Sequence, residues 1–326
     1  MEFRTLVVPE SSSFRIGYDT RGLMLGSCFI SHIGNKMQRL KLPVCVNPFG
    51  VIYNPASVVR SLIRMENPCF LEEKDLFLQQ GIWSSFDYHS TFSSPRQEEA
   101  LSRMNTALEH AASALRKSDY LILTLGTAWV YKHKRTNRIV CNCHKVRADE
   151  FERYLLSPEE IERMFSGLLE QELYRDKQIL FTVSPIRHLK DGLAGNTRSK
   201  AHLITAVHRL AERFGNVDYF PAYEIMMDDL RDYRFYEADM IHPSPVAVDY
   251  IWERFAETWI APESRNLFGR IEKITAAKEH RPFNKSSDGY RQFVRSMLDN
   301  ADKLQQDFPF LDFREEIDFF SNCLTE

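Results

Sequence analysis

Short apolar runs alternate with amphipathic stretches along most of this chain, and this alternation constrains the fold more than any other feature. The apolar runs have the length of β-strands and cover residues 23–26, 43–46, 120–126, 178–183 and 217–220. Runs of this kind are typical of parallel strands that are buried on both faces. The chain is therefore predicted to form an α/β fold, a three-layer α/β/α sandwich around a roughly five-stranded parallel sheet.

The predicted helices carry their apolar residues on one face. The clearest covers residues 96–117, where Leu101, Met104 and Leu108 recur at the helical period. Further helices are predicted over residues 30–40, from residue 157, and over residues 200–214 and 246–259.

The pattern changes after residue 262. An amphipathic helix is predicted over residues 290–304, and residues 308–320 are rich in aromatic side chains. We therefore divide the chain into a domain of residues 1–262 and a C-terminal helical extension of residues 263–326. The extension is expected to pack on the sheet domain or to join two copies of the chain in a homodimer.

Composition and charge argue against several kinds of partner. The net charge of −3 is unlike that of a nucleic-acid surface, which normally carries a basic excess. The longest strongly apolar run, residues 120–125, is far too short to span a membrane, and residues 1–10 do not resemble a signal peptide. The six cysteines show no framework spacing, so free thiols in a reducing compartment are expected. These observations predict a cytoplasmic protein with no nucleic-acid or membrane partner.

Two motifs far apart in the sequence carry the residue types of acyl-transfer chemistry. Gly26-Ser27-Cys28-Phe29 follows the first apolar run and opens a helix. Its side chains are therefore expected at the carboxyl edge of the sheet, where α/β proteins bind ligands. Asp239 and His242 are three residues apart, and a carboxylate beside an imidazole fixes its tautomer and stabilises its charged form. The alternative for this pair is a loop histidine beside a helix cap.

Several motifs occur in the order found in a known family. They are Gly26-Ser27-Cys28-Phe29, Asn47-Pro48-Phe49-Gly50, Phe86-Asp87-Tyr88-His89-Ser90, Gly126-Thr127-Ala128-Trp129, Asn142-Cys143-His144-Lys145, Ser184-Pro185-Ile186-Arg187-His188 and Asp239-x-x-His242-Pro243-Ser244. Together they resemble the GSCFA domain family over about residues 3–260, and that family is related to the SGNH (GDSL-like) hydrolases. The resemblance implies an SGNH/flavodoxin-like fold and a hydrolase site.

The resemblance leaves two candidates for the nucleophile. SGNH hydrolases carry their nucleophilic serine after a Gly-Asp pair, and in that register Ser27 takes the aspartate position and Cys28 the serine position. Cys28 is favoured, and a cysteine at a helix N-terminus near a histidine is expected to have a low pKa. A shift of one residue would instead form a triad of Ser27, His242 and Asp239. The remaining alternative is a buried, inert Cys28.

By the same resemblance, backbone N–H groups near the nucleophile and Gly50 hold the oxyanion, with Asn47 close by. The usual asparagine donor is absent because Ala128 stands in its place. Such a donor is worth about 100- to 1,000-fold in rate. Thr127, Asn47 and His89 are the candidate replacements. The alternative for His89 is a packed loop histidine.

The remaining predicted substrate contacts come from Gly126, Asn142, His144 and Arg187. Arg187 is a candidate for an anionic group of the substrate, or else a solvated charge, while Asn142 and His144 form a loop near the cleft or a structural turn. The C-x-C-H sequence at Cys141 lacks the second ligand pair of a tetrahedral zinc site, so no metal is expected. No phosphate-binding glycine motif occurs, and no cofactor is expected.

The predicted function is hydrolysis of an ester-linked acyl group, such as an acetyl group on a carbohydrate. His242, oriented by Asp239, takes the proton of Cys28 or Ser27, and the nucleophile attacks the acyl carbon. Water or a sugar hydroxyl then releases the acyl group. The alternatives are an acyltransferase on the same scaffold and a non-catalytic module that binds a glycan or metabolite in the cleft.

Overall fold

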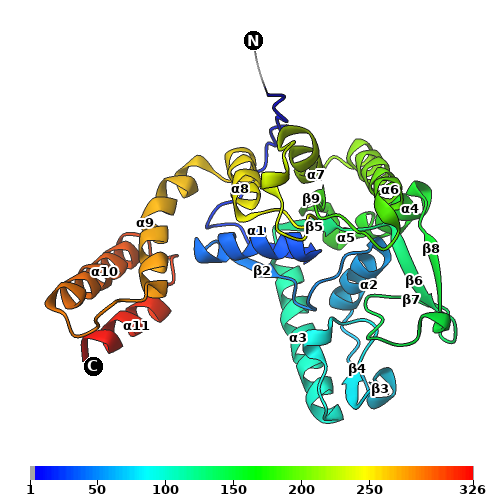
Figure 1. The fold of residues 1–326 in the computed structure, drawn as a ribbon, viewed down its shortest axis with the longest axis horizontal. Coiled ribbons are helices and arrows are strands. Elements are labelled where there is room, and N and C mark those ends of the chain that lie inside the picture. The colour runs from blue at the N-terminus through cyan, green and yellow to red at the C-terminus, as the bar shows by residue number, and fades with distance from the viewer. Residues whose placement is uncertain (1–3, 326) are drawn as a thin grey trace.

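A five-stranded sheet, parallel throughout, runs through the centre of the computed structural model, which describes residues 4–325 (Figure 1). Its strands are β1 (Gly22–Gly26), β2 (Val44–Val46), β5 (Tyr120–Leu125), β9 (Gln178–Val183) and β10 (Val217–Phe220). Across the sheet they lie in the order β10-β9-β5-β1-β2. Numbered 1 to 5 along the chain, this is the flavodoxin-like order 2-1-3-4-5. All five predicted strands are confirmed.

Two layers of helices cover the sheet because both of its faces are apolar. In β1, Leu23 and Leu25 point to one face and Met24 points to the other, since successive side chains of a strand alternate. The face with the two leucines is covered by α2 (Pro55–Glu66), α3 (Gln97–Lys117), α4 (Pro158–Leu169), α5 (Glu172–Arg175) and α6 (Gly192–Arg213). The other face is covered by α1 (Cys28–Arg39), α7 (Ala222–Glu224) and α8 (Pro245–Trp259).

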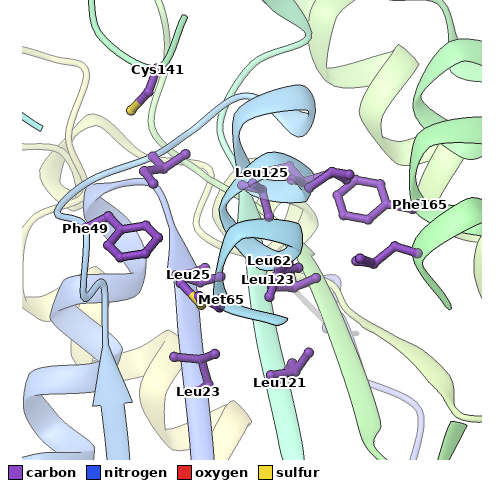
Figure 2. Packing of buried hydrophobic residues seen from close by; sticks show 14 of the residues in the cluster. Leu23, Leu25, Phe49, Leu62, Met65, Leu121, Leu123, Leu125, Cys141 and Phe165 are labelled. Atoms are coloured by element: carbon purple, nitrogen blue, oxygen red, sulfur yellow. The ribbon is translucent and has the colours of Figure 1, made fainter. Parts of the chain in front are cut away.

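The larger core lies on the leucine face of the sheet. Figure 2 shows leucines of β1 and β5 directed toward the side chains of α2, namely Leu23, Leu25, Leu121, Leu123, Leu62 and Met65. These six side chains are fully buried. Since each buried leucine stabilises the fold by about 1.5–3 kcal/mol, this layer holds the strand ends that carry the site in place.

Several short elements lie in segments that the sequence analysis leaves irregular or unassigned. Two antiparallel sheets are formed by β3 (Phe77–Gln79) with β4 (Ile82–Ser84), and by β6 (Trp129–His133) with β7 (Arg138–Val140) and β8 (Phe151–Leu155). Short 3₁₀ turns cover Glu73–Asp75, Ser90–Phe92, Ala148–Glu150 and Tyr233–Phe235, and a π-helical turn covers Ile225–Asp229. These strands lie outside the central sheet and are partly exposed, so they lack a continuous apolar run.

The predicted C-terminal helical extension is confirmed. It consists of α9 (Pro262–Glu279), α10 (Asp288–Asp307) and α11 (Arg314–Thr325), which share a core of their own and project to one side of the sheet domain (Figure 1). The extension contacts the sheet domain of the same chain through an ion pair between Lys41 and the buried Glu316, with Nζ 2.7 Å from the carboxylate. The ring of Phe310 also stacks on Tyr18.

None of the helices described between residues 4 and 325 is long and apolar enough to cross a lipid bilayer.

Candidate active site

A hollow of about 260 Å³ opens at the carboxyl edge of the sheet. Its walls come from the segments that follow four different strands of the sheet. The lining residues include Ser27 and Cys28 after β1, Tyr53 after β2, Gly126 and Thr127 after β5, and Ser184, Arg187 and His188 after β9. In the flavodoxin-like order, β2 pairs with one edge of β1, and β5 later pairs with the opposite edge of β1. Because the chain changes direction across the sheet at this point, a crevice forms between β1 and β5. The hollow lies at this switch point, the position at which such sheets bind ligands.

Gly26 makes the sharp turn from β1 into α1 possible. Its φ of +152° lies in a region that favours glycine. A Cβ at this position would lie 2.3 Å from the carbonyl oxygen of Thr124 on the neighbouring strand. The turn therefore needs a glycine, and it places the next two residues at the wall of the hollow.

Ser27 and Cys28 occupy different environments at this turn. Ser27 is the N-cap residue of α1, and its hydroxyl oxygen is buried and has no hydrogen-bond partner among the described residues. Cys28 is the first residue of the helix and is half-buried. Burial raises the pKa of the Cys28 thiol, against the opposing effects of the backbone N–H groups of Cys28 and Phe29 and of the charge of Lys200. The expectation of a low pKa for Cys28 is therefore wrong, because desolvation outweighs the helix N-terminus.

Asp239 and His242 form the hydrogen-bonded pair that their spacing suggests. Nδ1 of His242 lies 2.6 Å from a carboxylate oxygen of Asp239, whose other oxygen accepts from the backbone N–H groups of Ile241 and His242. The bonds from these two N–H groups and from the imidazole lower the pKa of Asp239 to about 2. The carboxylate is thus ionised at neutral pH and holds the imidazole in one orientation, which leaves Nε2 for proton exchange.

The Asp–His pair lies beside the hollow rather than inside it. A second hollow, of about 430 Å³, is lined by Asp239, and Arg187 lines both hollows. The backbone N–H of Arg187 donates to the carbonyl of Ile241 at 3.4 Å, which ties the loop of the pair to the wall beside Cys28. Within residues 4–325, no hydrogen bond joins His242 to Cys28 or Ser27.

His32 gives a second indication of where His242 lies. Burial and then the charge of His242 lower the pKa of His32, so these two rings are close enough to interact. His32 follows Cys28 by one turn of α1, which places the two side chains on the same side of the helix. His242 therefore lies near the part of α1 that carries His32.

Three other predicted site residues form a scaffold behind the turn. Asn47 accepts from the backbone N–H of Gly26 and donates to the hydroxyl of Ser31, so both ends of its amide are engaged. The N–H of Gly50 donates to the carbonyl of Asn47, and a Cβ on Gly50, whose φ is +76°, would lie 2.3 Å from Cβ of His89. Asn47, Gly50 and His89 are not among the residues that line the hollow.

Asn142 and His144 form a structural turn, the alternative considered from the sequence. The side-chain oxygen of Asn142 accepts from the backbone N–H of His144. Nε2 of His144 is 2.8 Å from the carbonyl oxygen of Ser85 and 3.1 Å from that of Tyr88, so the imidazole joins two loops. Neither residue lines the hollow. Across the described part of the chain, no three His, Cys, Asp or Glu side chains cluster as metal ligands would.

Gly126 and Thr127, the two predicted site residues that follow β5, both line the hollow. Each is already hydrogen-bonded to a neighbouring segment of the protein. The N–H of Gly126 donates to the carbonyl of Tyr53 at 2.7 Å. The hydroxyl of Thr127 is 2.9 Å from that of Ser199 and accepts from the N–H of Trp129. The structure therefore brings together Ser27, Cys28, Gly126, Thr127 and Arg187 of the predicted site.

No role is predicted from the sequence for Lys200, and Tyr53, Ser184 and His188 are also missing from the predicted site. Lys200 lies in α6, its side chain is fully buried, and Nζ donates to the carbonyls of Gly126 and Ser184 at the edge of the hollow. In the sequence it resembles any other lysine of an amphipathic helix. The only available signal is its place one residue after Ser199, close to the apolar face of α6.

These features define an α/β protein of flavodoxin-like topology with a cysteine-containing hollow at its switch point and an Asp–His pair on the adjoining loop. Comparison with protein-family models matches residues 21–255 to the GSCFA family and residues 271–326 to the C-terminal domain of GSCFA domain proteins. The chain belongs to the GSCFA family. A comparison with curated proteins gives no match.

Proposed function

We propose that this protein is an SGNH-like hydrolase that removes an ester-linked acyl group, with Cys28 as nucleophile. The observation that carries the proposal is the position of Cys28, at the N-terminus of α1 and in the wall of the switch-point hollow. The Asp239–His242 pair on the adjoining loop supplies a base whose tautomer is set by its carboxylate.

In the proposed mechanism, Nε2 of His242 takes the proton of the Cys28 thiol as sulfur attacks the acyl carbon. The tetrahedral intermediate then breaks its C–O bond, and the leaving alcohol receives the proton held by His242. Water, deprotonated by His242, attacks the thioester and releases the acid and the thiol. Because the N–H of Gly50 is engaged by Asn47, the proposed oxyanion donors are the backbone N–H groups at the start of α1.

Cys28 is favoured over Ser27 because of accessibility. The hydroxyl oxygen of Ser27 is buried, and Ser27 is only 5% exposed, whereas Cys28 is half-buried. An attacking atom must reach the acyl carbon at about 3–3.5 Å, which a fully covered oxygen does not allow without a change in the turn.

The size and charge of the hollows support the proposed substrate class. The 260 Å³ hollow lies below the usual range of about 300–1,000 Å³ for drug-sized ligands, which suits a short acyl group such as acetyl. The adjoining 430 Å³ hollow leaves room for the carbohydrate or other alcohol. Arg187 lies between them and contacts the hydroxyl of Tyr236 and the sulfur of Met227, and no described carboxylate pairs with it. It is therefore suited to an anionic group of the substrate.

A brief exposure to 4-nitrophenyl acetate, followed by an acid quench and peptide mass spectrometry, tests this proposal. We expect an acetyl adduct on Cys28 that disappears in His242→Ala. The exposed Cys69 provides an internal control for non-enzymatic acylation, and His110→Ala, at an exposed histidine of α3, is the matched control variant. Equal labelling of Cys28 and Cys69, or undiminished labelling of Cys28 in His242→Ala, would contradict the triad.

Two further functions use the same hollow. Attack on the thioester by an alcohol instead of water would make the protein an acyltransferase, and the adjoining 430 Å³ hollow favours this because it has room for an acceptor. A non-catalytic binding module is favoured by the lack of a hydrogen bond between His242 and Cys28 among the described residues, and by Ala128 in place of the usual asparagine. An adduct that is released faster by an added sugar than by water would indicate the transferase, and no adduct at all would indicate the binding module.

A further inference from the structure

Lys200 is a buried cation that pairs with no acidic side chain among the described residues. Its side chain is 1% exposed, and Nζ lies 2.6 Å from the carbonyl oxygen of Gly126 and 2.7 Å from that of Ser184. No carboxylate within residues 4–325 forms an ion pair with it. Buried lysines are normally paired with an acid, because removing an ammonium from water is costly. Such a position calls for a role beyond packing.

The two carbonyls place the ammonium directly beneath the hollow. Gly126 follows β5 and Ser184 follows β9, and both residues line the hollow together with Cys28. Lys200 therefore joins two strand ends at the switch point and brings a positive charge to the wall that also carries the candidate nucleophile.

Few titratable or charged groups face this ammonium. They are Cys28 from α1, Arg187 and His188 from the segment after β9, and the ring of Tyr223, whose centroid is 5.8 Å from Nζ. Burial lowers the pKa of Lys200 to about 7, with a smaller decrease from the charge of Arg187, while a charge on Cys28 raises it. In return, the charge of Lys200 lowers the pKa of Cys28. The two groups are therefore coupled in their ionisation.

We propose that Lys200 is a positioning residue for Cys28, which holds the floor of the hollow through two carbonyls and stabilises the thiolate with its ammonium. This inference rests on the proposed role of Cys28 as the nucleophile. When the thiol gives its proton to His242, Lys200 keeps its own proton, so its ammonium faces the thiolate that forms. The support is available only while Lys200 is protonated, which means at neutral pH and below.

The pH profile of alkylation separates this electrostatic role from a structural one. The rate of Cys28 alkylation by iodoacetamide would be measured by peptide mass spectrometry from about pH 6 to pH 9. Lys200→Gln keeps N–H donors for the two carbonyls but carries no charge. We expect the unaltered protein to react about threefold or more faster than Lys200→Gln near pH 6, as a change of half a pKa unit would produce. The ratio should fall toward one near pH 9, as Lys200 loses its proton.

Lys190→Gln is the matched control, because Lys190 is an exposed lysine two residues after His188, which lines the same hollow. Its profile should follow that of the unaltered protein. A ratio for Lys200→Gln that is the same at every pH, in a variant with unchanged near-UV circular dichroism, would overturn the proposal, since a displaced thiol loses reactivity uniformly.

A second measurement needs no variant and covers the case in which Lys200→Gln does not fold. The logarithm of the alkylation rate of an isolated thiol rises by about one for each pH unit below its pKa. In the unaltered protein we expect a shallower rise for Cys28 between about pH 6 and pH 8, where Lys200 titrates, with the exposed Cys69 as the internal reference. Parallel profiles for the two cysteines would overturn the proposal. Alkylation does not depend on acyl transfer, so this outcome is independent of whether an acetyl adduct forms.

Discussion

Replacing Lys200 with methionine tests the electrostatics of the site through the stability of the fold. Methionine has nearly the length of lysine but cannot ionise. It leaves the carbonyls of Gly126 and Ser184 without their donor, and the loss of two buried hydrogen bonds costs on the order of 1–3 kcal/mol each. This loss is the same at every pH, so the pH dependence of stability isolates the ionisation of Lys200.

The expected pH dependence follows from the difference between the folded and unfolded states. In the folded protein the pKa of Lys200 is about 7, below its ordinary value of 10.5. Between these two pH values the unfolded chain binds a proton that the folded protein does not, so the free energy of unfolding rises with pH. The penalty is about 4 kcal/mol at pH 7 and about 2 kcal/mol at pH 9, since each pKa unit corresponds to about 1.4 kcal/mol. The unaltered protein should therefore gain about 2 kcal/mol over this range relative to Lys200→Met.

Urea-induced unfolding at pH 7 and pH 9, with linear extrapolation to water, measures this difference. Groups that titrate over this range without interacting with Lys200 contribute equally to both proteins and cancel. Lys190→Met, at an exposed lysine, should show the pH dependence of the unaltered protein. If the free energies of unfolding of the unaltered protein and Lys200→Met change in parallel between the two pH values, Lys200 does not titrate near pH 7 and the reasoning fails.

Three further predictions concern the turn, the pair and the extension. Gly26→Ala should destabilise the protein by about 2–4 kcal/mol in urea unfolding, since its Cβ would collide with the Thr124 carbonyl. The control Gly167→Ala, inside α4 where a Cβ meets no other atom, should stabilise the protein by about 0.5–1 kcal/mol, and equal changes in the free energy of unfolding would contradict the geometry. Asp239→Asn should lower the rate of acyl transfer by about 100-fold or more at all pH values above about 4, because Asp239, with a pKa of about 2, is ionised throughout that range. A loss of rate confined to acidic pH would refute its role in orienting His242. The proposed homodimer through residues 263–326 should appear in light scattering as twice the chain mass of 38.2 kDa, and a monomer mass would exclude it.

Elements whose signal is local in the sequence were predictable. The strands β1, β5 and β9 are buried on both faces, so each appears as a continuous apolar run, and the Asp239–His242 bond forms between residues three apart. The segments of β6, β7 and β8 carry no such run, because one side of each short strand faces solvent. The helix α2 was also not predicted, although Asn54 caps it and Pro55 begins it.

The amino-acid sequence by itself determined the class of fold, the helical extension, the family and the candidate nucleophile and base, because apolar periodicity and short motifs are properties of neighbouring residues. The tertiary structure decided what each polar side chain does. It directs Asn47 and His144 to backbone groups of other segments, covers the hydroxyl of Ser27, and buries Lys200 beneath the hollow. The physical reason is that burial and hydrogen bonding depend on segments that are separated in the sequence, by 21 residues for Gly26 and Asn47 and by 74 residues for Gly126 and Lys200. The pKa values of Cys28 and Lys200 follow from that environment.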